Sequence, residues 1–303
     1  MPIEMPAVSL VAVPGRRRAT LEVATELEKR GFAGIWSPSM FSNLSLAEAL
    51  CHVTRTMTFA TSIAPIYSRT LLDFAQSAAF IHELSGGRFR LGVGVSHAPS
   101  HVRMGVTPGK PLADMRSFVG KLRASAGLGA MPPVVLAALR TNMVKLAGEI
   151  GDGIVFANAS RSHMPASLSS LPEARRNDAG FSIANMIPTC ISDDVEAAKA
   201  VNRRTLTSYG LLPNYRNYWK EAGYVEEMEA IEKAVAENRK EDVPKYFSDR
   251  WLADCTLFGP RNKVLEGVEA WREAGVRTPI IVPSSAAGNQ MKALEEIMAA
   301  FAA

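Results

Sequence analysis

Short apolar segments alternate with longer amphipathic segments along the first third of the chain. The predicted strands are residues 7–13, 33–37, 57–64 and 89–95. The predicted helices, in which apolar side chains recur at helical spacing, are residues 18–32, 44–56 and 70–87. Gly31, Gly86 and Gly87 are typical of helix ends. Because strands that alternate with helices pair in parallel through right-handed crossovers, this pattern predicts an α/β fold.

The second half of the chain continues the alternation less regularly. Further predicted strands are residues 132–139, 152–158, 182–191 and 277–284, and further helices are residues 141–151, 262–275 and 291–301. Eight units of strand and helix without a shift in composition favour one (β/α)8 TIM barrel domain over residues 1–303. An open doubly wound sheet is the alternative, but no strand is followed by a G-x-G-x-x-G turn. Residues from about 203 to 245 are rich in helix signals and are expected to form an inserted helical arm.

Charge and cysteine usage narrow the classes of protein. The net charge is only +4 and the isoelectric point is about 9.0. The densest basic cluster, Gly15–Arg18, opens a helix, so a solvated helix start is expected and contact with an anionic substrate is the alternative. Basic residues are not interleaved with aromatics, which argues against a nucleic-acid partner. Cys51, Cys190 and Cys255 match no metal-ligand spacing and are expected to be buried thiols.

Hydropathy along the chain bears on its compartment. The N-terminus lacks a charged region followed by an apolar core, the pattern of a signal peptide. No apolar run is long enough to span a bilayer. We therefore expect a cytoplasmic protein with no membrane partner.

The stretch SGGRFRLGVGVSHAPSH, residues 85–101, is the most informative part of the chain. Strand alternation would point Gly92 and Gly94 into the barrel and leave a hollow near the strand's carboxyl end. Barrel active sites lie at that face, so the hollow could accept a flat ring. The alternative is that these glycines only relieve crowding inside the barrel.

Two histidines, His97 and His101, follow this strand. No third ligand lies nearby in the pattern that zinc requires, so no metal is expected. Pro99 argues against a regular helix between them. A loop histidine at the catalytic face suits proton transfer, because its ordinary pKa is near neutrality, and we therefore predict that His97 is catalytic. A hydrogen-bonded loop histidine without chemistry is the alternative.

Several segments together resemble the luciferase-like monooxygenase superfamily, a barrel family of flavin-dependent monooxygenases and coenzyme F420-dependent oxidoreductases. The resembling segments are residues 31–36, 61–97, 133–158 and 212–224. No single motif carries the resemblance, but the order and spacing of the segments do. The resemblance implies a TIM barrel enzyme that binds a flavin or deazaflavin ring.

The resemblance also implies a set of site residues. A non-proline cis peptide that backs the ring is expected at Ser62–Ile63. The implied cofactor-binding residues are Ser62, Ile63, Ala64, Gly94, Val95, Ser96, Ala138, Leu139, Arg140, Thr141 and Asn158. The loop 138–141 would hold the ribityl phosphate at a helix start, with ordinary capping by Thr141 as the alternative. Expected substrate-binding residues are Met40, Tyr67 and His101.

One departure from the family pattern changes the expected chemistry. Many F420-dependent relatives carry an Asp–His pair after the second strand, where this chain has Ser39 and Met40. The catalytic role of that pair cannot be carried over, which leaves His97 as the acid/base candidate. The segment between the fourth helix and the fifth strand is also short, so the substrate pocket is either more open or covered by another segment such as the arm around residues 211–224.

The expected activity is hydride transfer between coenzyme F420 and a small organic substrate. One alternative is an FMN-dependent monooxygenase that uses molecular oxygen and a separate flavin reductase as partner. Another is a flavin-binding barrel without catalysis. Arg69, Arg140 and Arg161 are candidates to meet the acidic tail of F420, and a homodimer is expected from the resemblance.

Overall fold

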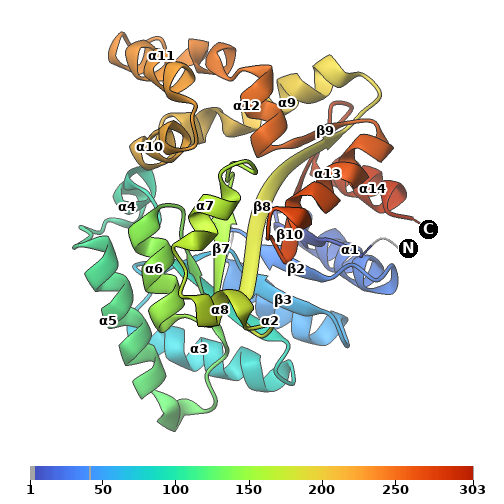
Figure 1. Cartoon of the computed structure of the whole chain (residues 1–303). Helices are drawn as coiled ribbons and strands as arrows, with labels where there is room; N and C mark the ends of the chain where they lie inside the picture. The colour runs from blue at the N-terminus through green and yellow to red at the C-terminus, as the bar shows by residue number, and fades with distance from the viewer. Residues whose placement is uncertain (1–3, 41, 303) are drawn as a thin grey trace. The chain divides into compact units, whose positions relative to one another are not determined.

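The computed structural model describes residues 4–40 and 42–302. The strands are β1 (Ala7–Ser9), β2 (Gly34–Ser37), β3 (Thr58–Thr61), β4 (Ala64–Pro65), β5 (Phe89–Gly94), β6 (Val134–Ala137), β7 (Gly153–Ala157), β8 (Ser182–Ile191), β9 (Leu257–Gly259) and β10 (Thr278–Ser284). Their order is β10–β1–β2–β3–β5–β6–β7–β8–β9, and β10 also pairs with β8. The path therefore closes into a barrel with β4 and β9 as additional short strands, and the predicted TIM barrel is confirmed (Figure 1).

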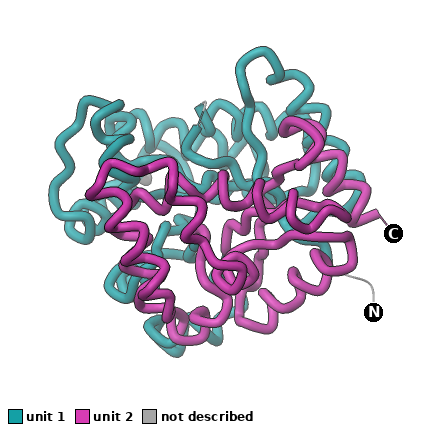
Figure 2. The backbone as a smooth tube through the Cα atoms, turned by 90° about the horizontal axis from the view of Figure 1, so that it is seen from above, with its two compact units in different colours: residues 1–156, 169–184 teal, residues 157–168, 185–303 magenta. Residues whose placement is uncertain are grey.

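The chain divides into two compact units (Figure 2). Unit 1 comprises residues 1–156 and 169–184, and unit 2 comprises residues 157–168 and 185–303. The helices of unit 1 are α1 (Arg17–Lys29), α2 (Asn43–Val53), α3 (Leu71–Leu84), α4 (Ala98–Met104), α5 (Pro111–Ala124), α6 (Thr141–Ile150), α8 (Glu173–Asn177) and the 3-10 helix η1 (Ala126–Leu128). The helices of unit 2 are α7 (Met164–Ser169), α9 (Val195–Gly210), α10 (Pro213–Glu221), α11 (Val225–Ala236), η2 (Lys240–Tyr246), α12 (Asp249–Cys255), α13 (Arg261–Glu273) and α14 (Gln290–Ala300).

In unit 1, successive helices pack side by side around the strands. Helix α1 contacts α2, α2 contacts α3, α3 contacts α5 and α5 contacts α6; these are the blue-to-green helices of Figure 1. Helix α1 shows why these residues form amphipathic helices, because Val23, Ala24 and Leu27 are buried on one face. Between α3 and α5, the rings of Phe74 and Phe118 meet edge to face with centroids 5.2 Å apart. Helices such as α1 thus bury one apolar face, whereas α4 and α8 contain no buried residue.

In unit 2, the helices between β8 and β9 share an aromatic core. The Phe247 and Trp251 rings stack with centroids 4.2 Å apart, and the Trp219 ring meets Trp251 edge to face at 4.8 Å. Helix α12 begins where the Ser248 hydroxyl accepts the Trp251 amide hydrogen at 3.1 Å. Helices occupy the region predicted as an inserted arm, residues 203–245. Its boundaries and its place in one barrel domain stay predictions.

Two features of the chain bear on the earlier expectations about compartment. Cys51, Cys190 and Cys255 are free and buried, as predicted. Among residues 4–40 and 42–302, no helix is both long and apolar enough to cross a membrane.

The region after β5 differs from the prediction. Residues 98–104 form the regular helix α4, so the prediction from Pro99 that no regular helix forms here is wrong. The proline lies in the first helical turn, where a backbone N–H would have no acceptor within the helix. Because no hydrogen bond is lost there, the proline does not disturb the helix. Helix α5, which begins at Pro111, was not predicted at all.

Candidate active site

A backbone bulge separates β3 from β4. Ala60 lies opposite Arg90 of β5, whereas Ala64 lies opposite Val93. Four steps along one chain therefore match three along the other, which is the register change of a β-bulge. The peptide bond Ser62–Ile63 within the bulge is cis, as the family resemblance implied.

Hydrogen bonds tie the bulge to its neighbours in unit 1. The Ser62 N–H donates to the Ser37 carbonyl at the end of β2, with 2.6 Å between nitrogen and oxygen. The Thr61 hydroxyl donates to the Gly92 carbonyl at 2.7 Å. The Asn43 side-chain amide donates to the Ile63 carbonyl at 3.0 Å. Asn43, the first residue of α2, was not among the predicted site residues, and no motif in the sequence marks it.

The glycines of β5 accommodate this bulge. A β-carbon added at Gly92 would lie 1.8 Å from the Thr61 carbonyl oxygen, so only glycine permits that close approach. The predicted hollow beside Gly92 is therefore wrong, because the backbone of β3 fills it. At Gly94, an added β-carbon would lie 3.0 Å from the Ile63 and Ala137 side chains. Gly94 thus lies directly beside the bulge at the end of the strand.

The chain leaves β5 through Val95, Ser96 and His97. Ser96 has a φ of 63°, a left-handed conformation that is uncommon outside glycine. His97 follows in an extended conformation as the N-cap residue of α4. Burial lowers the pKa of His97, and the neighbouring charge of His101 lowers it further. The His97 imidazole is therefore neutral at pH 7 and able to accept a proton.

The two predicted substrate residues Tyr67 and His101 lie together. Their rings meet edge to face with centroids 5.5 Å apart. The His101 Nε2 atom lies 2.6 Å from the Val95 carbonyl oxygen, and because a carbonyl only accepts, Nε2 must carry the proton. The Tyr67 hydroxyl donates to an Asp114 carboxylate oxygen at 2.6 Å. Burial and this carboxylate raise the pKa of Tyr67 well above its ordinary value.

Asp114 was missed by sequence reasoning. Besides Tyr67, its carboxylate accepts the Gly109 amide hydrogen at 2.9 Å, so it joins the loops before α3 and before α5. An acidic residue in the first turn of a helix that begins with a proline is the signal that would have pointed to it. Among the residues that the structure describes, no group of three His, Cys, Asp or Glu side chains is placed to hold a metal ion.

Met40, the third predicted substrate residue, follows β2. Its side chain is 53 % exposed, and its amide nitrogen donates to the Pro38 carbonyl at 2.7 Å. Nothing in the described structure packs it into a pocket with Tyr67 and His101, and its role stays a prediction.

The loop after β6 leads into α6. Ala138 is buried and its N–H donates to the Val155 carbonyl at 3.1 Å. After Leu139, Arg140 is the N-cap residue and Thr141 is the first helical residue, with no side-chain capping hydrogen bond at Arg140. The alternative of capping by Thr141 is therefore wrong. The positive end of the helix dipole lies at Arg140 and Thr141, which suits an anion.

Asn158, the remaining predicted cofactor residue, belongs to unit 2. It follows β7 with a φ of 55° and is only 3 % exposed. Its carbonyl accepts the Trp219 indole N–H at 3.1 Å. Burial raises the pKa of Tyr209 and Tyr215, and a hydrogen bond from the Asn158 side chain partly offsets that rise, so Asn158 interacts with both of these tyrosines of unit 2.

A buried carboxylate holds the loop that follows Asn158. Asp254 of α12 accepts hydrogen bonds from the Ser160 hydroxyl, from the Ser162 amide and hydroxyl, and from the Tyr224 hydroxyl at 2.8 Å. Burial acts to raise the pKa of Asp254, but these donors outweigh it and lower the pKa below its ordinary value. The carboxylate therefore stays ionised and fixes the loop to α12 and to the start of α11.

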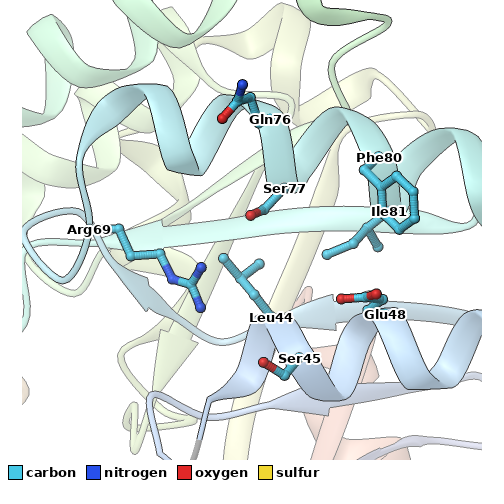
Figure 3. Close-up of a pocket in the computed structure, with 8 residues that line it drawn as sticks. All are labelled: Leu44, Ser45, Glu48, Arg69, Gln76, Ser77, Phe80 and Ile81. Atoms are coloured by element: carbon cyan, nitrogen blue, oxygen red, sulfur yellow. The ribbon is translucent and has the colours of Figure 1, made fainter.

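Arg69, a candidate for the acidic tail of F420, lies in a different setting. It forms an ion pair with Asp73, with 3.0 Å between nitrogen and oxygen. Figure 3 shows it at a pocket between α2 and α3. The residues that line this pocket are Leu44, Ser45, Glu48, Arg69, Gln76, Ser77, Phe80 and Ile81. None of the predicted catalytic, cofactor-binding or substrate-binding residues is among them.

The chain is similar in sequence and in structure to known reductases. The chain is 25 % identical to a 5,10-methylenetetrahydromethanopterin reductase of Archaeoglobus fulgidus, with 94 % of this chain and 95 % of the relative covered. The structure of a coenzyme F420-dependent tetrahydromethanopterin reductase from Methanopyrus kandleri superposes with a TM-score of 0.77 and 16 % identity, covering 97 % of each chain.

A second kind of structure is also similar. The oxygenating constituent of 3,6-diketocamphane monooxygenase from Pseudomonas putida, solved in complex with FMN, superposes with a TM-score of 0.63 and 15 % identity over 98 % of each chain. These likenesses establish the shared barrel fold. The family model described as luciferase-like monooxygenase matches residues 6–278, and the chain therefore belongs to the luciferase-like monooxygenase family.

Proposed function

We propose that this protein is an oxidoreductase that transfers a hydride between coenzyme F420 and a small organic substrate, with His97 as the acid/base. The observation that carries the proposal is the position of His97, a partly buried and neutral imidazole shortly after the end of β5, the strand that pairs with β4 beyond the bulge. The similar reductases from Archaeoglobus fulgidus and Methanopyrus kandleri support a hydride-transfer reaction.

The residues of unit 1 fit a deazaflavin or flavin. The bulge at Ser62–Ala64 would back the ring, and Gly94–Ser96 would line its edge. The Ser37 hydroxyl at the end of β2 is buried and has no partner among the described residues, which leaves one polar group for a bound molecule. The start of α6, at residues 138–141, would hold the phosphate through its N–H groups and Arg140. When bound, the coenzyme supplies the hydride donor or acceptor.

The protein's own contribution to the reaction is then to move a proton. The neutral His97 imidazole accepts the proton of a substrate hydroxyl during oxidation, or returns it during reduction. His101 cannot take this role with Nε2, because that atom already donates to the Val95 carbonyl. His101 instead holds the α4 helix against the end of β5.

FMN with molecular oxygen is the second candidate, since the similar 3,6-diketocamphane monooxygenase component contains FMN. F420 and FMN share the tricyclic ring and the ribityl phosphate, so the same residues would hold either one. An FMN enzyme of this kind would need a flavin reductase as its partner, whereas an F420 enzyme would not. The third candidate is a barrel that binds a flavin but catalyses no reaction.

Parallel fluorescence titrations of the purified protein with F420 and with FMN test the proposal. We expect F420 to bind more tightly than FMN. Tight binding of FMN alone would transfer the proposal to oxygen chemistry with a reductase partner. Binding of F420 without turnover of any alcohol or carbonyl substrate would favour the non-catalytic barrel, and binding of neither would overturn the cofactor site.

A further inference from the structure

We propose that Asn43 is a positioning residue that fixes the β3–β4 bulge in the shape against which the cofactor ring rests. This inference builds on the proposed function, because it takes the bulge at Thr61–Ala64 as the support of the ring. Asn43 itself lies at the start of α2 and is not among the residues predicted to touch the cofactor or the substrate.

The contacts of Asn43 converge on the bulge. Its Nδ2 atom lies 3.0 Å from the Ile63 carbonyl oxygen and 3.5 Å from the Ser37 carbonyl oxygen. The Ser37 carbonyl also accepts the Ser62 N–H at 2.6 Å. One amide nitrogen thus joins the last residue of β2 to the middle of the bulge. We call these three residues, Ser37, Asn43 and Ile63, the carbonyl clamp.

The chemistry of the carbonyl clamp requires an amide. Two backbone carbonyls need two hydrogens from one atom, and the NH2 group of asparagine supplies them. Asn43 is only 8 % exposed, so water cannot easily replace the donor. An aspartate would have the same shape but would offer only acceptors, and it would repel both carbonyls.

The backbone around Asn43 also favours this arrangement. Ser42, the N-cap residue of α2, has a φ of 60° and makes no side-chain capping bond. The chain thus enters α2 through a left-handed residue whose side chain does nothing for the helix end, and this turn brings the next side chain to the bulge. The local geometry serves the contact with Ile63 rather than the capping of α2.

The test compares Asn43→Asp and Asn43→Ser with a matched control, Asn202→Asp. Asn202 is fully buried in unit 2, and its amide nitrogen donates to the Leu257 carbonyl at 3.1 Å and to the Thr256 hydroxyl at 3.0 Å. The control therefore loses the same kind of hydrogen bond away from the bulge. Serine at residue 43 is a milder change, because it is small and uncharged but too short to span the clamp.

Two readouts separate positioning from plain stability. Hydrogen exchange without cofactor should speed up in peptides covering residues 60–66 in both Asn43 variants and stay unchanged there in Asn202→Asp. F420 or FMN, whichever the wild type binds, should bind about tenfold more weakly, or about 1.4 kcal/mol, to the Asn43 variants. Asn202→Asp should lose thermal stability while keeping wild-type affinity.

The outcomes are distinct. Unchanged exchange at residues 60–66, or a loss of stability like that of the control with unchanged affinity, would overturn the proposal. If neither Asn43 variant folds while Asn202→Asp does, Asn43 determines the fold and the positioning role is also overturned. If the wild type binds neither cofactor, the proposed function fails, but the exchange experiment still decides whether Asn43 fixes the bulge.

Discussion

The loops around the β3–β4 bulge in unit 1 and the helices α9–α12 in unit 2 are held together by different means. Near the bulge, side chains such as Asn43 and His101 bind backbone carbonyls, and several polar groups remain partly exposed. In α9–α12, stacked aromatic rings form the core, and one buried carboxylate, Asp254, satisfies the polar groups at its edge.

Side chains near the bulge therefore determine where polar and reacting groups lie, whereas the aromatic side chains of α9–α12 mainly bury apolar surface. Aromatic rings stabilise mainly through the apolar area that they bury, whereas hydrogen bonds to carbonyls fix the positions of individual backbone atoms. Substitutions near the bulge should therefore change binding or turnover more than stability. Substitutions among α9–α12 should do the reverse.

The largest expected effect is on the stability of unit 2. Asp254→Ala removes an acceptor from two serines and a tyrosine, and each buried donor left unpaired costs about 1–3 kcal/mol. We expect the free energy of unfolding to fall by about 3–4 kcal/mol, measured by urea denaturation. The control is Asp249→Ala on the same helix, whose carboxylate pairs with Lys199 at the surface. An equal loss in both variants would contradict the assigned role of Asp254.

The ionisation of Asp254 should also make the free energy of unfolding depend on pH. Because its pKa in the folded protein lies below that of the unfolded chain, ionised Asp254 stabilises the fold at neutral pH. This contribution should disappear as the pH falls from about 4 through the lower folded-state pKa. The stability difference between wild type and Asp254→Asn should therefore shrink on acidification. A difference that stays constant from pH 7 to pH 3 would show that the charge does not matter.

The next effect in size concerns turnover. His97→Gln should lower kcat about 100-fold, equal to about 2.7 kcal/mol, and leave cofactor affinity within twofold. The exposed His52 on α2 provides the control His52→Gln, which should behave as wild type. Because burial and His101 lower the pKa of His97, activity that requires its neutral form should persist below pH 6.5 and fall only at more acidic pH. Unchanged kcat in His97→Gln would remove His97 from the mechanism.

Periodicity in the sequence predicts the barrel well because strands and helices bury regular faces. Strand β8 was predicted with its observed bounds, Ser182–Ile191. The position of the bulge came from resemblance rather than from the pattern, since nothing periodic distinguishes Thr61 to Ala64. Asn43 and Asp114 were missed for another reason. Their importance lies in contacts with Ile63 and Tyr67, distant in sequence, and a single polar residue at a helix start gives no sign of such a partner.

The smallest effect is expected at the opposite end of β3. There Glu28 of α1 accepts the backbone N–H groups of Arg55, Thr56 and Met57, at 2.8–3.0 Å, immediately before the strand begins. Burial acts to raise the pKa of Glu28, but these three donors lower it overall. Like the carbonyl clamp, this contact uses one side chain to hold backbone groups, but it lies at the amino-terminal side of the barrel strand, where residues serve stability rather than catalysis.

Glu28→Gln keeps the size of the side chain and removes its charge and one acceptor oxygen. We expect a loss of about 1–2 kcal/mol in the free energy of unfolding, measured by denaturation at pH 7, with unchanged cofactor affinity. The exposed Glu22 on the same helix gives the control Glu22→Gln, for which no change is expected. If Glu28→Gln weakens cofactor binding as much as Asn43→Ser does, a change at one end of β3 reaches the other end. The hydrogen bonds of Asn43 near the bulge would then not be what fixes the surface on which the ring rests. Preserved affinity would instead confine the positioning role to the carboxyl end of the strand.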